Sequence, residues 1–268
     1  MVIKNLIPEI KRSRGYFIYD TRGVRYLDFY QDSGRAILGH RLEGITRVVK
    51  STVARGITAA YPSVYMNRIG RELNLLFPDV ASFRVYRNLE RAMAAISVSE
   101  GCDVSISDFI DFPSTESPFG IWRPFLNTSI NWSGFKYFIP ILPFPGDFGP
   151  VVLAVNEKDS SLAPSDNLSP MICDMMVKSI SSLIKHIKNG NCVGGSDFES
   201  PLWDPVGPYL RFRLKGNDYS NLFKKALTHS VLLPPEPGLP GIIPCNYEPG
   251  QIKGFMKMVG EYRSEYGS

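Results

Sequence analysis

The stretch from residue 15 to residue 40 restricts the fold more than any other part of the chain. It reads GYFIYDTRGVRYLDFYQDSGRAILGH. Aromatic and β-branched residues fill positions 16–19 and 24–29, and the intervening Asp-Thr-Arg-Gly is a favourable turn sequence. The pattern predicts a β-hairpin, followed by a loop and a Leu-Gly-His step.

Two amphipathic helices are expected after the hairpin. Apolar residues recur at helical spacing over residues 41–55 and 65–77, and Pro78 ends the second segment. Residues 83–86 then predict a short buried strand, and residues 90–99 a helix rich in small side chains.

The stretch from residue 101 to residue 150 differs from the rest because it contains seven prolines among many aromatic side chains. A proline inside a helix costs about 3 kcal/mol, so long helices are excluded here. Short strands and packed loops are expected instead.

The C-terminal part alternates strands and helices. Residues 151–155 predict a core strand, and Ser169-Pro170 begins the clearest helix of the chain, which ends at Asn189-Gly190. Further strands are expected at 209–214 and 231–233. Further helices are expected over 219–228 and, after a proline-rich stretch, around 252–262.

The first segment resembles the entry segment of class III pyridoxal-phosphate aminotransferases of the ornithine and glutamate-1-semialdehyde type. That segment reads approximately G-x-x-x-x-D-x-x-G-x-x-Y-L-D-F, then a glycine-rich loop and L-G-H. The matching residues are Gly15, Asp20, Gly23, Tyr26, Leu27, Asp28, Phe29, Leu38, Gly39 and His40. The resemblance covers roughly residues 1–96 and, more weakly, 165–265.

The resemblance implies an α/β chain with a reduced aminotransferase fold, similar to fold type I of the pyridoxal-phosphate-dependent transferases. It implies a truncated large-domain sheet and a small α+β domain from both termini. A single βαβ crossover takes about 30 residues, so residues 96–154 hold at most two. The expected parts are an N-terminal segment of the small domain (1–60), a reduced large, cofactor-type domain (61–168) and the C-terminal small domain (169–268).

The departures from the family fall on the cofactor chemistry. In the family, an N-S-G-T-E-A motif at a helix N-terminus supplies amides and a hydroxyl to the phosphate. The equivalent residues 87–92 read RNLERA, which keeps Glu90 but lacks the Ser-Gly-Thr. Arg87 and Asn88 are the candidate phosphate ligands that remain, with Arg87 able to supply charge.

Such a cofactor also needs a Schiff-base lysine and an acidic partner for its pyridine nitrogen. Between Arg91 and Leu168 the only lysines are Lys136 and Lys158, and the latter lies in a polar turn sequence. Lys136 is therefore the candidate catalytic residue, although its neighbours do not resemble the family's lysine loop, and a snorkelling lysine is the alternative. Asp108 and Asp111 are the candidate acids because they precede Lys136 in the family's order, with strand-end or turn aspartates as the alternative.

The composition of the chain limits the kinds of partner and the cellular location that are expected. The net charge of +4 comes from scattered side chains, so nucleic acid is not expected as a partner. No stretch approaches the roughly 20 apolar residues of a membrane span, and residues 1–15 do not resemble a signal peptide, so a cytoplasmic protein is expected. The four cysteines lack a C-x-x-C pair and are expected as free thiols, and no metal site is indicated.

Three hypotheses follow. The first is an aminotransferase-like homodimer with an eroded cofactor site, which binds a small molecule or a partner without transamination. The second is an active pyridoxal-phosphate aminotransferase or aminomutase with a rebuilt site around Lys136, Asp108 or Asp111, and Arg87 or Arg123. The third is a structural subunit for a longer relative.

Overall fold

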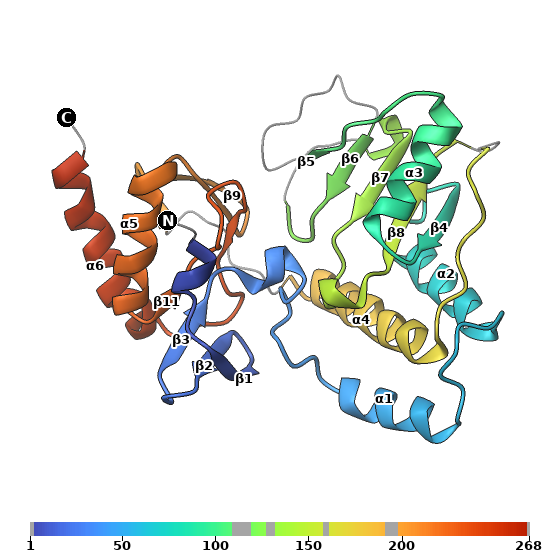
Figure 1. Cartoon of the computed structure of the whole chain (residues 1–268), viewed down its shortest axis with the longest axis horizontal. Coiled ribbons are helices and arrows are strands. Elements are labelled where there is room, and N and C mark those ends of the chain that lie inside the picture. The colour runs from blue at the N-terminus through green and yellow to red at the C-terminus, as the bar shows by residue number, and fades with distance from the viewer. Residues whose placement is uncertain (1–2, 109–118, 127–131, 158–160, 191–197, 267–268) are drawn as a thin grey trace. The chain divides into compact units, whose positions relative to one another are not determined.

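The computed structural model describes residues 3–108, 119–126, 132–157, 161–190 and 198–266, and its chain forms two compact units (Figure 1). Unit 1 comprises Met1–Leu42, Phe125–Asn127 and Asn191–Ser268, and unit 2 comprises Glu43–Pro124 and Thr128–Gly190. These divisions differ from the boundaries at 60 and 168 that the sequence suggests. The reason is that α4 (Pro170–Lys188) packs against α1 (Ile45–Ala54) and α2 (Val64–Leu76), which places all three helices in unit 2.

Unit 1 contains the expected hairpin. Strand β2 (Phe17–Asp20) pairs antiparallel with β3 (Arg25–Asp28), and Phe17 lies opposite Leu27. The sheet is completed by β1 (Ile10–Arg14) on one side and by β11 (Val231–Leu232), parallel to β3, on the other. The 3₁₀ helix Ile3–Leu6 precedes these strands in sequence, and a kinked turn at Gln31–Gly34 follows β3.

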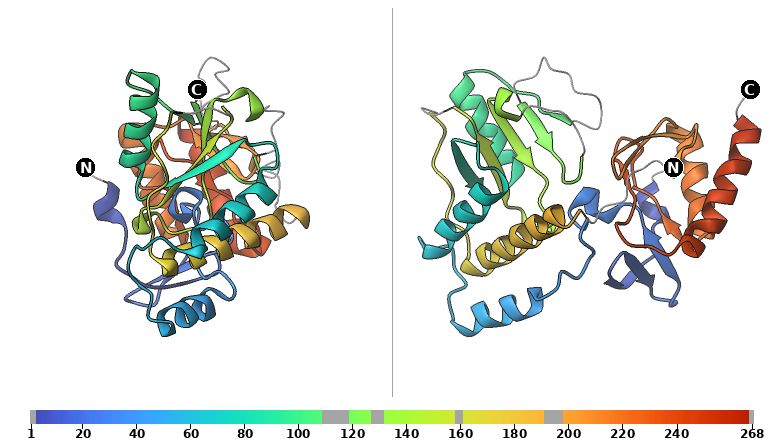
Figure 2. Two further views of the ribbon diagram at one scale, coloured as in Figure 1. Left: turned by 90° about the vertical axis from the view of Figure 1, so that its right-hand side faces the viewer. Right: turned by 180° about the vertical axis from the view of Figure 1, so that it is seen from behind.

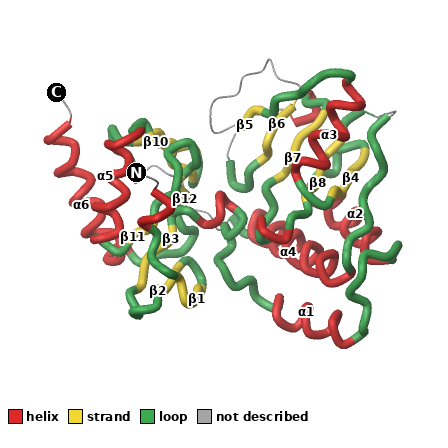
Figure 3. Tube along the Cα trace, in the orientation of Figure 1, coloured by secondary structure: helices red, strands yellow, loops and turns green. Residues whose placement is uncertain are grey.

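The C-terminal elements of unit 1 form a second sheet and two helices. The strand order is β12-β10-β9, from Gly241–Ile242, Tyr209–Phe212 and Trp203–Val206. Helices α5 (Gly216–Thr228) and α6 (Pro249–Tyr266) lie side by side (Figure 3). Together with the hairpin they bury a large aromatic and aliphatic core that includes Phe29, Trp203, Phe223 and Phe255.

Unit 2 contains a five-stranded sheet in the order β4-β8-β7-β6-β5. The strands are β4 (Ser82–Tyr86), β5 (Ser107–Asp108), β6 (Phe119–Trp122), β7 (Tyr137–Pro140) and β8 (Val151–Val155). Strands β5, β6 and β7 are parallel, whereas β8 is antiparallel to both β7 and β4. The carboxyl ends of β4, β5, β6 and β7 therefore lie at one edge of the sheet.

The two faces of this sheet differ in what covers them. Helix α3 (Leu89–Glu100) lies across one face and buries Ala92, Ala95 and Ile96 against it (Figure 2). The other face carries an aromatic cluster around Phe138, which is contacted by residues 76–80 at the end of α2. Among the described residues, none of the helices combines the length and the apolar character needed to cross a bilayer.

The cysteines require one correction. Cys102 and Cys173 are free thiols as expected, but Cys245 is disulfide-bonded. A sequence without close Cys pairs gives no sign of such a bond, because pairing depends on which distant residues the fold brings within about 7 Å.

Candidate functional site

The motif residues of the entry segment hold the backbone of unit 1 together. The buried Asp28 carboxylate accepts hydrogen bonds from the amides of Tyr30 (2.8 Å) and Gln31 (3.0 Å) and lies 2.6 Å from His40 Nε2. The amide of His40 in turn donates to the Gly15 carbonyl at 2.8 Å. The Asp and His of the motif thus link the hairpin to the loop that follows it.

Close backbone packing explains one motif glycine. Gly39 has a φ of 89°, and a β-carbon there would lie 3.2 Å from Gly15 Cα. A larger residue at position 39 would therefore be strained both by its dihedral angle and by the neighbouring chain. The Leu-Gly-His step serves packing in this unit.

The loop after β3 has an unusual backbone. Gln31, Asp32 and Ser33 have φ values of 46°, 49° and 56°, in the left-handed region that favours glycine. Such residues cost roughly 1–2 kcal/mol each and persist only where surrounding contacts hold them. Here the Asp28 carboxylate and the bond from Gln31 Nε2 to the Ile242 carbonyl (3.0 Å) do so.

The carboxyl edge of the unit 2 sheet is where ligands usually bind in open α/β folds. Asp108 ends β5 at this edge, and Arg123 directly follows β6. The Arg123 guanidinium donates to both carboxylate oxygens of Asp108, at 3.0 Å from Nε and 2.7 Å from Nη2. Arg123 is only 4% exposed, so this bidentate ion pair is largely withdrawn from solvent.

Lys136 lies at the opposite edge. It directly precedes β7. Asp108 pairs with Ile121 of β6, and Ile121 pairs with Ile139 of β7, so Asp108 is level with a position three residues after Lys136. Strand geometry places the backbones of Lys136 and Asp108 about 14 Å apart. The fold therefore brings Asp108 and Arg123 together, whereas Lys136 lies apart from both. Asp111, the other candidate acid, lies outside the described residues.

Lys136 has acidic neighbours of its own. Its Nζ lies 2.8 Å from Glu100 at the end of α3 and 3.1 Å from Glu157, which follows β8. The hydrogen bonds to Glu100 and then Glu157 raise the pKa of Lys136 well above its ordinary value, and Lys136 lowers the pKa of Glu100. The geometry favours a permanently charged ammonium group.

The N-terminus of α3 is the place that the sequence assigns to a phosphate. Asn88 caps the helix, because its side-chain oxygen accepts from the Arg91 amide at 2.8 Å. The Asp166 carboxylate accepts from the Arg87 amide at 3.0 Å and lies 3.6 Å and 3.7 Å from the guanidinium groups of Arg87 and Arg91. The Asp166 carboxylate therefore already lies beside the helix N-terminus, where an anionic ligand would bind.

Two further segments fix this arrangement. The stretch that carries Asp166 runs along the outer edge of β4, where Val85 donates to the Ser165 hydroxyl (3.0 Å) and accepts from the Asp166 amide (2.9 Å). On the other side, Gly149 packs so tightly that a β-carbon would lie 2.6 Å from the Arg87 carbonyl oxygen. The approach to Arg87 is thus bounded by the chain itself.

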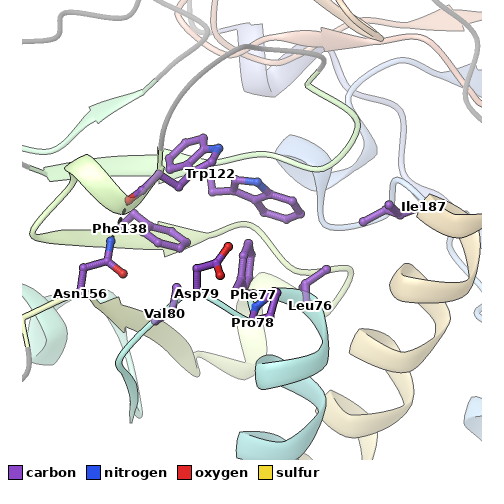
Figure 4. Close-up of a pocket in the computed structure, with 10 residues that line it drawn as sticks. Leu76, Phe77, Pro78, Asp79, Val80, Trp122, Phe138, Asn156 and Ile187 are labelled. Carbon is purple, nitrogen blue, oxygen red and sulfur yellow. Dashed lines mark hydrogen bonds between the residues drawn. The ribbon is translucent and has the colours of Figure 1, made fainter.

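A separate pocket of about 510 Å³ lies on the aromatic face of the unit 2 sheet (Figure 4). It is lined by Leu76, Phe77, Pro78, Asp79, Val80, Trp122, Trp132, Phe138, Asn156 and Ile187. No pattern in the sequence predicts this pocket. The only local signals are the two tryptophans in the proline-rich stretch and the Pro-Asp step after α2, and neither indicates that these segments meet.

Comparisons with known proteins support the fold. No family model matches the chain. An uncharacterised protein of Borreliella burgdorferi is 25% identical over 99% of this chain and 94% of its own length. Glutamate-1-semialdehyde 2,1-aminomutase of Thermus thermophilus is 30% identical over 95 residues, which are 35% of this chain and 22% of that protein.

Solved aminotransferase structures match nearly the whole chain. Ornithine δ-aminotransferase of Plasmodium falciparum aligns with a TM-score of 0.73 at 12% identity, over 96% of this chain and 93% of that one. Acetylornithine aminotransferase of Elizabethkingia anophelis aligns with a TM-score of 0.65 at 12% identity, over 97% and 94%. The chain therefore has a reduced form of the aminotransferase fold, which confirms the fold that the sequence predicts.

Proposed function

We propose that this protein is an aminotransferase-fold binding protein that does not transfer amino groups. The observation that carries the proposal is the Asp166 carboxylate beside the N-terminus of α3, where an active relative would hold the phosphate of its cofactor. The protein would keep the fold as a scaffold and use it to bind a small molecule.

The residues at this position do not fit pyridoxal phosphate. The Arg87 amide and the side chains of Arg87 and Arg91 already face the Asp166 carboxylate. The side-chain oxygen of Asn88 already accepts a hydrogen bond from the helix backbone. A phosphate would have to displace Asp166 or accept repulsion from it, and like charges at contact distance are strongly unfavourable. Leu89, the first residue of the helix, adds no hydroxyl group.

Lys136 is a poor candidate for a Schiff base. A lysine acts as a nucleophile only when its amine is neutral, and active sites achieve this by lowering its pKa. The two glutamates have the opposite effect on Lys136, which also lies at the other edge of the sheet from Asp108. The Asp108 carboxylate already accepts hydrogen bonds from the Arg123 guanidinium group.

A spectroscopic titration tests the proposal. Purified protein titrated with pyridoxal phosphate should show only the absorption of the free cofactor, and the Lys136→Met variant should behave identically. A full-length aminotransferase of the same fold serves as the positive control. A saturable visible band in the wild type that disappears in Lys136→Met would overturn the proposal in favour of the enzyme.

We also propose that the chain forms homodimers, which the family resemblance implies. Large apolar side chains on α2 and α3 are exposed, among them Val64 (64%), Leu75 (67%) and Val98 (83%). Sedimentation velocity at several concentrations should give the mass of a dimer, and Leu75→Glu should shift it toward the monomer. A concentration-independent monomer would contradict this proposal. Co-purification with a longer relative would favour the structural-subunit hypothesis.

A further inference from the structure

We infer that the pocket on the aromatic face of the unit 2 sheet binds a protonated primary amine that carries a flat apolar group. The inference rests on the proposed small-molecule binding and names its site and ligand class. The pocket volume of about 510 Å³ lies within the range of known small-molecule sites. Its lining combines an aromatic wall, one carboxylate and one unsatisfied hydrogen-bond acceptor.

The aromatic wall is organised before any ligand arrives. The ring of Phe77 meets Trp122 edge-on at 4.9 Å and Phe138 at 5.2 Å, and Trp132 contacts Phe138 at 5.2 Å. Because the rings support one another, little side-chain entropy remains to be lost on binding. Aromatic faces attract organic cations, and tryptophan does so most strongly.

Asp79 is the charged group of this pocket. It lies three residues after the end of α2, next to Pro78. Figure 4 shows its carboxylate beside Phe77 and Phe138, on the side of Trp122. Over the described parts of the chain, no basic side chain pairs with Asp79. A carboxylate next to aromatic faces selects a cationic ligand over a neutral or anionic one.

Asn156 supplies the acceptor. Its side-chain nitrogen donates to the carbonyls of Trp132 and Phe135, both at 2.7 Å, which fixes the amide orientation. Its oxygen Oδ1 is buried and finds no donor among the described groups. Figure 4 shows this oxygen on the side where Phe138, Val80 and Asp79 lie. Leaving a buried acceptor unsatisfied costs about 1–3 kcal/mol, which an ammonium N–H would recover.

Calorimetric titration with three matched probes tests the inference: phenethylamine, the neutral phenethyl alcohol and the anionic hydrocinnamate. Pyridoxal phosphate is left out, so the result does not depend on the cofactor test. We expect the amine to bind at least about tenfold more tightly than the alcohol, and hydrocinnamate to bind most weakly. Intrinsic fluorescence should change on amine binding, since two of the three tryptophans line the pocket.

Variants then assign the site. Asp79→Asn should reduce the affinity for the amine to that for the alcohol, and Trp122→Leu should weaken the binding of both. Asp147→Asn, which removes an exposed carboxylate of unit 2 away from the pocket, is the matched control and should bind as wild type. Equal affinity for amine and alcohol, or an amine preference that survives in Asp79→Asn, would overturn the inference. In either case the cofactor titration still stands as a separate test of the proposed function.

Discussion

Replacing Asp108 with alanine is expected to lower the free energy of unfolding of unit 2 by about 3 kcal/mol. Arg123 is almost completely buried, and its guanidinium group is held by both oxygens of this carboxylate. Removing one partner of a buried ion pair is costly because the remaining charge loses its compensation while it stays out of water. The same pair joins the carboxyl ends of β5 and β6, so the edge of the sheet should loosen as well.

Urea denaturation and hydrogen exchange measured by mass spectrometry check this prediction. Peptides from β5 and β6 should exchange faster in Asp108→Ala, and Asp108→Asn, which keeps one acceptor, should lose less stability. Asp103→Ala is the control, since Asp103 is exposed and forms no ion pair within the described parts of the chain, and it should change stability by less than about 0.5 kcal/mol. Equal effects of Asp108→Ala and Asp103→Ala would mean that the ion pair contributes nothing to stability.

Replacing Asp28 with alanine is expected to destabilise unit 1 by about 3 kcal/mol. Its carboxylate is 2% exposed, accepts hydrogen bonds from the amides of Tyr30 and Gln31, and contacts the ring of His40. Each buried donor that loses its acceptor costs about 1–3 kcal/mol. The loop that contains Gln31, Asp32 and Ser33 is also held in left-handed conformations that relax without this anchor.

Thermal unfolding monitored by the fluorescence of Trp203, a core residue of unit 1, reports this loss. Asp28→Asn should be milder because the amide oxygen can still accept from the two backbone amides. His40→Ala removes only one of the three contacts and should fall between Asp28→Asn and Asp28→Ala. If Asp28→Ala unfolds at the same temperature as the wild type, the Asp and His of the entry motif do not stabilise unit 1.

The sequence predicts those elements whose signal is local. The hairpin at residues 16–29 has a strong turn between two β-rich runs, and α4 has a proline start and a clear apolar face; both are found. Strand β1 has no recognisable signal in the sequence, because all five of its residues are exposed and they form no apolar pattern. The pairing of β11 with β3 joins the two ends of unit 1, and no local pattern indicates it.

The candidate site was harder to predict because it depends on the relative positions of segments. Lys136 and Asp108 lie in the order that the family resemblance implies, yet a difference of three residues in strand register puts them at opposite edges of the sheet. Asp166 lies in a polar stretch that gives no functional signal, and only the packing of that stretch along β4 brings it to Arg87. Pairings of this kind follow from topology and register.

The absence of a covalently held cofactor is the central claim, and reductive trapping tests it most directly. The protein would be purified from cells supplied with pyridoxine, treated with borohydride without added cofactor and analysed by intact mass and peptide mapping. We predict an unmodified chain, with Lys136 recovered in its native peptide. A near-stoichiometric pyridoxyl adduct on one lysine would contradict the proposed function and show that the reduced fold still holds the cofactor.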